Sequence, residues 1–221
     1  MAKGFFIAIE GPDGCGKSTQ IALLAAALKE RGFDVVLTRE PGGTRLGEEI
    51  RKVLLLSKEE NFSPYAELLL FEAARAQHVE EVLKPAIKEG KVVIASRYAE
   101  ATRAYQGGGR GLPLTEVAAA NELGTRGLWP DLTIILDIDS EEGLRRVKGC
   151  QEGAAGKDLP PGELDRIEKE SLDFHRRVRK EYLSLAEEEK DRVRVVDGSR
   201  AVGEVSKEVL ALVLERLHDR S

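Results

Sequence analysis

The sequence has few of the residues that build metal centres and disulfide frameworks. Its 221 residues include only two cysteines, three histidines and one tryptophan. Cys15 and Cys150 lie far apart and match no metal or redox spacing, so we expect two free thiols in a reducing compartment. The histidines are scattered without a ligand pattern, and we expect them to serve packing or the surface.

Long apolar runs and an excess of basic residues are also missing. No stretch approaches the roughly 20 apolar residues of a membrane span, and the N-terminal segment MAKGFFIAIEG soon becomes too polar for a signal peptide. We therefore expect no membrane partner and a cytoplasmic location. The formal net charge of -5 argues against a general nucleic-acid binder. This net charge is compatible with the binding of small anions, because a local basic cluster can bind them inside an acidic protein.

Five short apolar segments alternate with helical patterns along the chain, at residues 4–10, 34–38, 91–95, 131–138 and 192–197. Buried strands separated by helices are typical of a parallel sheet. The sequence therefore predicts an α/β fold in which a parallel five-stranded sheet is covered by helices on both faces, with residues 1–221 in one domain. Ligands bind at the carboxyl ends of the strands in such sheets.

Two of the predicted helices are long. One covers residues 63–89, with a Ser-Pro start and a bend at Pro85, and the other is a charged helix over residues 163–190. Shorter helices are predicted over residues 18–32, 44–57, 114–125, 140–148 and 202–216. Residues 149–162 are rich in Gly and Pro without an apolar period, which indicates a mobile loop between two helices.

The segment GPDGCGKST fits the phosphate-binding pattern G-x-x-x-x-G-K-[ST], known as the P-loop, and it lies between a strand and a helix. Its glycines let backbone N–H groups turn inward on a phosphate, and the helix N-terminus adds partial positive charge. Lys17 is expected to reach the β/γ-phosphates of ATP, and Ser18 to ligate Mg²⁺. The residues of this loop expected to bind ATP are Gly11, Asp13, Gly14, Cys15, Gly16, Lys17, Ser18 and Thr19.

A second anion site is indicated where other strands end. Arg39 and Arg97 each follow a predicted strand. Phe71 and Arg75 are four residues apart, which puts an aromatic ring and a guanidinium on one helical face. That pair suits a flat heterocycle with a carbonyl edge. Three glycines follow Gln106, and we expect their backbone to close over the base. Asp13 lies inside the phosphate-binding loop, where its carboxylate would repel a phosphate, and so it needs a positive or hydroxyl partner.

These segments together resemble the bacterial thymidylate kinase family almost from end to end. The resemblance is carried by FIAIEGPDGCGKST, TREPGGT, LLLFEAARAQH, SRYAEATRAYQGGGRG, PDLTIILDI and ELDRIEKE. It implies a P-loop nucleoside monophosphate kinase fold with a lid at about residues 149–166. It also implies transfer of phosphate from ATP to dTMP, giving dTDP, with Mg²⁺ as the cofactor and a homodimer as the assembly.

The resemblance implies a role for individual residues of the acceptor site. The residues implied to bind dTMP are Asp13, Arg39, Glu40, Arg51, Phe71, Arg75, Arg97, Thr102, Tyr105 and Gln106. Among them, Arg39 and Arg97 hold the phosphate and Phe71 stacks on thymine. Arg75 and Gln106 hydrogen-bond the edge of the base.

The resemblance extends to the donor site. Arg146 is implied to lie against the adenine of ATP, and Lys17, Arg97 and Arg166 are implied to act in the transfer itself. One departure stands out, because Ser96 occupies the position where the family normally has Asp. Two alternatives therefore stay open at this point: a nucleotide-binding protein with weak or lost turnover, and a kinase for another nucleoside monophosphate.

Overall fold

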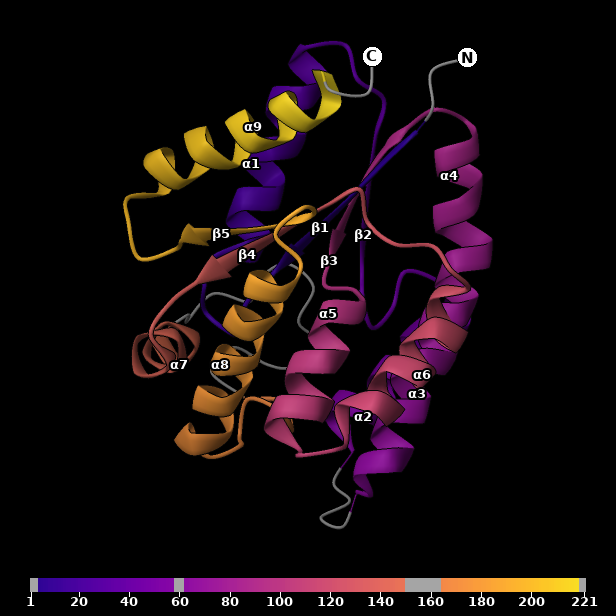
Figure 1. The fold of residues 1–221 in the computed structure, drawn as a ribbon, viewed down its shortest axis with the longest axis vertical. Helices are drawn as coiled ribbons and strands as arrows, with labels where there is room; N and C mark the ends of the chain where they lie inside the picture. The colour runs from indigo at the N-terminus through magenta and orange to yellow at the C-terminus, as the bar shows by residue number, and fades with distance from the viewer. Residues whose placement is uncertain (1–3, 58–61, 150–163, 219–221) are drawn as a thin grey trace.

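The structure is a computed structural model that describes residues 4–57, 62–149 and 164–218 (Figure 1). Its centre is a sheet of parallel strands in the order β2-β3-β1-β4-β5. The strands are β1 (Phe5–Glu10), β2 (Val35–Arg39), β3 (Val92–Ser96), β4 (Leu132–Asp137) and β5 (Val193–Asp197). The predicted parallel five-stranded sheet is confirmed, and each strand lies within about a residue of its predicted place.

The sheet is covered by helices on both faces (Figure 1). Along β1 every residue is buried, and alternate side chains point to opposite faces. Phe5, Ile7 and Ile9 pack in one core cluster with α1 (Lys17–Glu30) and α9 (Val202–His218). On the other face, Phe6 and Ala8 belong to a second cluster. The near-continuous apolar character of β1 is thus explained by burial on two faces.

The remaining helices range in length from four to seventeen residues, and some of them pack against the second face of the sheet. These elements are α2 (Arg45–Leu56), α3 (Pro64–His78), α4 (Lys84–Lys88), α5 (Ala99–Thr102), α6 (Leu114–Thr125), α7 (Ser140–Gly149) and α8 (Leu172–Glu188). Wider π-type turns, η1 (Val79–Leu83) and η2 (Arg103–Gly109), follow α3 and α5. None of the helices in the described ranges is long and apolar enough to cross a lipid bilayer.

The long helix predicted over residues 63–89 is present, and its irregularity lies just before the proline. The widened turn η1 spans Val79–Leu83 and leads into α4, which contains Pro85. Proline lacks an N–H and its ring crowds the carbonyl four residues earlier, so a wider turn there relieves the clash.

The charged helix predicted over residues 163–190 is wrong in its first third. The helix α8 begins only at Leu172, after Ser171, whose side chain accepts a hydrogen bond from the backbone N–H of Phe174 at 3.2 Å. Before it, Asp165 accepts from the N–H groups of Ile167 and Glu168, each at 2.8 Å, and so stabilises a turn. The predicted lid at 149–166 falls mostly on residues 150–163, which lie outside the described residues.

The structure also corrects the expectation that the backbone of the glycines after Gln106 closes over the base. Gly107 and Gly109 are buried within η2, which packs against α8. A Cβ on Gly109 would lie 2.5 Å from the ring of Phe174, and one on Gly108 would lie 2.7 Å from the Cβ of Glu181. These glycines therefore allow close packing of two helices, and the packing fixes the position of Gln106.

Candidate active site

A cavity of about 360 Å³ opens at the carboxyl ends of β1, β2 and β3. It is lined by most of the residues expected from the sequence: Asp13, Gly14, Gly16, Lys17, Ser18, Thr19, Glu40, Arg51, Phe71, Arg75, Arg97, Thr102, Tyr105, Gln106 and Arg146. Gly11, Cys15, Arg39 and Arg166 are the expected residues that are not part of this lining. One cavity thus joins the P-loop to the pocket around Phe71, and we call these its phosphate end and its base end.

The P-loop at the phosphate end depends on glycine geometry. Gly11, Gly14 and Gly16 all have positive φ angles, of 131°, 77° and 94°. A Cβ on Gly14 would lie 2.1 Å from the carbonyl oxygen of Gly143, so only glycine fits there. The ammonium of Lys17 curls back and donates to the carbonyls of Gly11 at 3.0 Å and Pro12 at 2.9 Å.

Arg97 stands at the end of β3 in a left-handed conformation, with φ 71°. Its guanidinium donates to Asp13 at 2.5 Å, to the hydroxyl of Tyr105 at 2.9 Å and to the hydroxyl of Tyr182 at 3.2 Å. Tyr105 in turn donates to Asp13 at 2.8 Å. Asp13 therefore has both the positive and the hydroxyl partner that a carboxylate in this loop requires. Burial would raise the pKa of Asp13, but the charges of Arg97 and Lys17 outweigh it and lower the pKa.

Ser96 precedes Arg97 in the chain and is not among the described residues that line the cavity. Its carbonyl accepts the backbone N–H of Glu40 at 3.0 Å, which ties the ends of β2 and β3 together. The direction of Arg97 is set by Asp13 and the two tyrosines, so a serine at position 96 is compatible with the arrangement of this arginine.

Glu10 lies beneath the phosphate end and is fully buried. It accepts hydrogen bonds from the backbone N–H of Tyr98 at 2.6 Å and from the hydroxyl of Tyr182 at 2.7 Å. Burial, with Glu100 as a further negative charge nearby, raises the pKa of Glu10 to about 7, although Arg97 opposes the shift. Tyr182 thus connects a buried carboxyl group to the arginine at the cavity.

At the base end, Arg75 is only 1% exposed. Each guanidinium nitrogen donates within the protein: Nε to Glu40 at 2.8 Å, one terminal nitrogen to Glu72 and to Asn121 at 2.9 Å, and the other to the carbonyl of Tyr98 at 3.0 Å and to Thr102 at 2.9 Å. A buried arginine with five hydrogen-bond partners holds α3, α5 and α6 in a fixed arrangement around the cavity.

Glu40 is the link between this arginine and the end of β2. One of its oxygens bonds Arg75, and the other lies 2.8 Å from Nδ1 of His78. Nε2 of His78 lies 2.6 Å from the hydroxyl of Thr38. The histidine is fully buried, which agrees with the packing role expected for it. A buried charge pair with these extra hydrogen bonds stabilises the base end, because its lone pairs and protons are satisfied.

Two expected phosphate ligands are held elsewhere. Arg39 is about one-third exposed and pairs with Glu48 at 2.9 Å. Arg166 donates to the carbonyl of Leu54 at 3.0 Å and pairs with the buried Glu67. The partners of the two arginines, Glu48, Leu54 and Glu67, are not part of the cavity lining.

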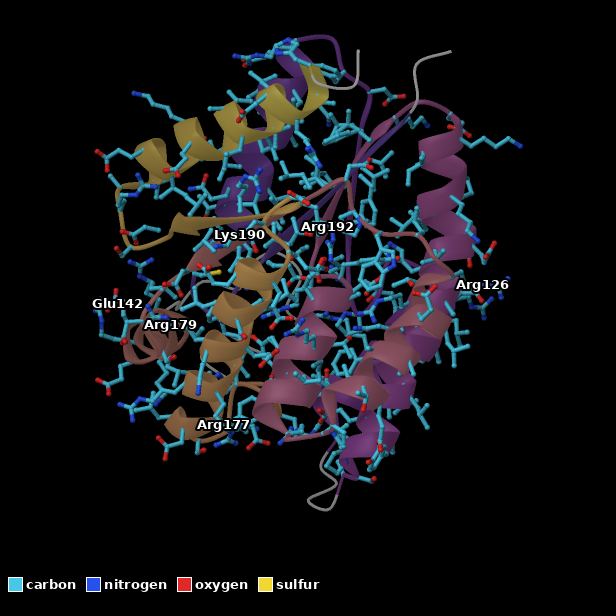
Figure 2. The ribbon with its side chains drawn as sticks, in the orientation of Figure 1. Arg126, Glu142, Arg177, Arg179, Lys190 and Arg192 are labelled. Atoms are coloured by element: carbon cyan, nitrogen blue, oxygen red, sulfur yellow. The ribbon has the colours of Figure 1, made fainter. Side chains whose placement is uncertain are left out.

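The donor side of the cavity is bounded by α7. Arg146 is paired with Glu142 at 2.8 Å, and Figure 2 shows Glu142 on α7 and Arg179 on α8 at this side of the molecule. Arg179 binds Asp137 through two hydrogen bonds of 2.8 Å. Asp137 is therefore already neutralised at the end of β4.

A Mg²⁺ ion bound together with phosphates needs only one or two protein oxygens, because it keeps several waters. The hydroxyl of Ser18 lines the cavity in the first turn of α1 and can supply one. Within the described ranges, no cluster of three or more His, Cys, Asp or Glu side chains could hold a metal ion by itself. The residues thus fit a nucleotide-bound ion rather than a dedicated metal centre.

Sequence reasoning missed several residues that shape the site. Glu67 lies four and eight residues before Phe71 and Arg75, so the same helical spacing could have identified it. Asp165, whose pKa is raised to about 6 by burial and by the charges of Glu168 and Asp13, lines the cavity within the misassigned turn. Tyr182 lies in α8, far along the chain from Arg97, and no local pattern marks it.

A P-loop between the first strand and first helix of a parallel sheet, continuous with a buried polar pocket, defines a P-loop enzyme of the nucleotide kinase type. Residues 9–209 match the thymidylate kinase family. The chain is 47% identical to a thymidylate kinase of Pelobacter propionicus, over 99% of this chain and 98% of the relative. It is 48% identical to one of Halothermothrix orenii, over 94% and 95%.

Solved structures agree with this result. The crystal structure of a thymidylate kinase from Ehrlichia chaffeensis is 32% identical, with a TM-score of 0.74 over 96% of this chain and 98% of that one. The chain belongs to the thymidylate kinase family. The expected nucleoside monophosphate kinase fold is confirmed.

Proposed function

We propose that this protein transfers the γ-phosphoryl group of ATP to dTMP, giving dTDP and ADP. The observation that carries the proposal is the single cavity that joins a P-loop to a pocket lined by Phe71, Arg75 and Gln106. A planar base fits against an aromatic ring, and guanidinium and amide groups suit its polar edge. Membership of the family supports the same activity.

The donor ATP would lie along the P-loop. The N–H groups of the loop and the N-terminus of α1 attract its phosphates, and Lys17 would exchange the carbonyls of Gly11 and Pro12 for phosphate oxygens. Ser18 would hold Mg²⁺, which neutralises charge on the phosphates when bound. Arg146 would lie against the adenine, since it lines the cavity on the α7 side.

The acceptor dTMP would lie in the base end with its phosphate toward Arg97. Phe71 would stack on the thymine, and Tyr105 would pack under the sugar, where a 2′-hydroxyl would clash. Asp13 would approach the sugar or the phosphate, with Arg39, Glu40, Arg51 and Thr102 completing the pocket. Glu40 acts through Arg75, to which it is bonded at 2.8 Å.

The transfer needs little covalent help from the protein. An oxygen of the dTMP phosphate bonds to the γ-phosphorus as the bond from that phosphorus to the bridging oxygen of ADP breaks. The acceptor is already an anion, so no general base is required. Lys17 and Arg97 position the two nucleotides and offset the charge that crowds between them. Arg166 would join them when residues 149–166 close as a lid, which would limit ATP hydrolysis by excluding water.

The proposal extends to the organisation of the protein. Residues 1–221 would form one domain and two chains a homodimer. Exposed leucine and valine side chains, Leu46, Val53, Leu69 and Leu123, lie on α2, α3 and α6, which pack side by side (Figure 1) and offer an apolar surface for a second copy. Small nucleotides in the cytoplasm, and no nucleic acid, would be its substrates, in keeping with the net charge of -5.

The test is to separate the products after incubation with Mg-ATP and dTMP. Equal amounts of dTDP and ADP are expected. The reaction should stop on chelation of Mg²⁺ and resume when Mg²⁺ is restored. ATP consumption without dTDP would overturn the proposal, as would transfer that a preparation of Lys17→Ala carries out equally well.

A further inference from the structure

The amide of Gln106 can face a ligand in two orientations that differ in chemistry. One places the carbonyl oxygen, an acceptor, toward the base, and the other places the NH₂ group, a donor, in the same position. Gln106 is 1% exposed and lines the cavity. Its nitrogen Nε2 donates to Oε1 of Glu67 at 2.7 Å. The nature of residue 67 therefore decides which orientation is stable.

Glu67 is fully buried in the first turn of α3 and faces two arginines. Nε of Arg110 donates to its Oε1 and a terminal nitrogen to its Oε2, each at 3.1 Å, and Arg166 also pairs with Oε2. Burial alone would raise the pKa of Glu67, but the hydrogen bonds from Arg110 and Gln106 and the two positive charges outweigh it and lower the pKa. The side chain is thus a carboxylate.

An ionised carboxylate accepts hydrogen bonds and donates none. The atom of Gln106 that faces Glu67 must therefore be the nitrogen, because an oxygen there would meet a buried negative charge. The carbonyl oxygen Oε1 then lies on the side of the amide away from Glu67. It is the atom left to accept a hydrogen bond from a base in the cavity.

We propose that Glu67, held by Arg110 and Arg166, is a positioning residue that fixes the amide of Gln106 with its oxygen toward the base and so selects pyrimidines that carry an N–H on their edge. Thymine and uracil have N3–H, a donor that matches this oxygen. Cytosine has an unprotonated N3, an acceptor that would face it and repel it. The inference rests on the proposed function and names a specificity determinant of the same cavity.

The substitution Glu67→Gln tests this directly. The oxygen of the new amide should turn toward the former Oε2 position, where one nitrogen each of Arg110 and Arg166 donates. The former Oε1 position receives one arginine nitrogen, Nε of Arg110, and so attracts the oxygen less. The NH₂ group of the new amide then faces Gln106, which can satisfy that donor only by presenting its own oxygen. Gln106 would flip, and its NH₂ group would face the base. This orientation favours cytosine and disfavours thymine, at unchanged size and shape.

The measurement is kcat/KM for dTMP and for dCMP with saturating Mg-ATP. We expect the dTMP-to-dCMP ratio to fall at least about tenfold in Glu67→Gln, since one buried hydrogen bond is exchanged for a repulsive contact. The control is Glu122→Gln, the same chemical change at an exposed position on α6, which should keep the ratio. A purely structural role for Glu67 would lower both rates together and leave the ratio unchanged, which would overturn the inference.

Folding of each variant is checked by thermal melting. If Glu67→Gln does not fold, Glu67→Asp takes its place, because it keeps the charge for the arginines and withdraws the carboxylate from Gln106 by one methylene. The ratio should then fall about threefold or more as the amide loses its fixed partner; an unchanged ratio would contradict the inference. A wild-type protein that does not phosphorylate dTMP would instead refute the proposed function, so the two failures are distinguishable.

Discussion

The two ends of the cavity hold their charges in different ways. At the base end, Arg75 and Glu67 are almost fully buried, and their partners lie on other helices. At the phosphate end, Lys17 and Arg97 are partly exposed and bind carbonyl and carboxylate groups of the P-loop itself. The charges of the base end are thus paired in the interior before a ligand arrives, and there only Arg75 would exchange one of its contacts for the base. At the phosphate end, both Lys17 and Arg97 must exchange internal contacts for phosphate oxygens.

This difference separates stability from catalysis. Losing a buried partner at the base end leaves other charges unpaired in a medium of low dielectric, which costs folding free energy. Losing a charge at the phosphate end leaves partners that water can reach, so the fold tolerates it while the reaction does not.

The largest effect is expected for Lys17→Ala. Removing the charge that neutralises the transferred phosphoryl group should lower kcat by about 10³–10⁵-fold, as large an effect as that of an arginine that stabilises the charge of the transition state. Binding of dTMP, measured by calorimetry, should change by less than about threefold, because the base end is intact. Lys29→Ala, at the exposed end of α1, is the control and should keep full activity. A strong loss of dTMP binding in Lys17→Ala would contradict the separation of the two ends.

At the base end, Arg75→Met should mainly destabilise the fold. It leaves Glu40 and Glu72 buried without their shared arginine, so the free energy of unfolding should fall by about 3–5 kcal/mol. Arg39→Met makes the same change at a pair with Glu48 whose side chains are each more than one-third exposed, and it should cost less than about 1 kcal/mol. Urea denaturation measures both. Equal losses in the two variants would break the comparison.

Stability should depend on pH through Glu10. Its folded-state pKa of about 7 lies above the ordinary value of 4.5, so the folded state favours the protonated form. The stability that this group contributes is complete below pH 4.5 and is lost as the pH rises through 7. Glu10→Gln should therefore gain up to roughly 3 kcal/mol relative to the wild type between pH 5 and pH 8.

Glu67 has the opposite sign, because its pKa is lowered in the folded state. The stability that Glu67 contributes is present above the ordinary pKa and is lost as the pH falls below it.

The prediction for Glu10 is tested by the unfolding free energies of the wild type and of Glu10→Gln at several pH values. Parallel curves from pH 5 to pH 8 would rule out the raised pKa of Glu10.

The smallest effect is expected for Arg146→Ala. This side chain is over one-third exposed and pairs with Glu142, so the stability should change by less than about 0.5 kcal/mol. The KM for ATP should rise about three- to tenfold with kcat nearly unchanged, as for a lost uniform binding contact. Arg145→Ala removes a more exposed arginine from the same Glu142 and should leave the KM unaltered. An effect of equal size in both variants would argue against a contact to ATP.

Local patterns predicted the sheet and the P-loop, because both depend on short apolar runs and on glycines at fixed spacing. The same approach failed at residues 164–171, where a charged composition resembles a helix but the carboxylate of Asp165 stabilises a turn. It also expected the backbone of the glycines after Gln106 to close over the base, although α8 packs directly against them.

The contacts that set the two ends apart could not be predicted in this way. Glu10 and Tyr182 are separated by 172 positions, and Arg75 and Asn121 by 46. Such partners meet only through the order of the strands and the packing of the helices. The sequence identified many of the charged side chains at the site, although not Glu67 or Asp165, and tertiary packing decided what each of them binds.

The most direct test of the whole account is kcat/KM with Mg-ATP for dTMP, dCMP, AMP and thymidine. Thymidine lacks the phosphate that the phosphate end would hold, and dCMP alters the edge that the base end would read. We predict that dTMP exceeds each of the others by at least about a hundredfold, since each loses at least one buried polar contact. Comparable turnover of thymidine or dCMP would contradict the account, because one end of the cavity would then play no part in choosing the substrate.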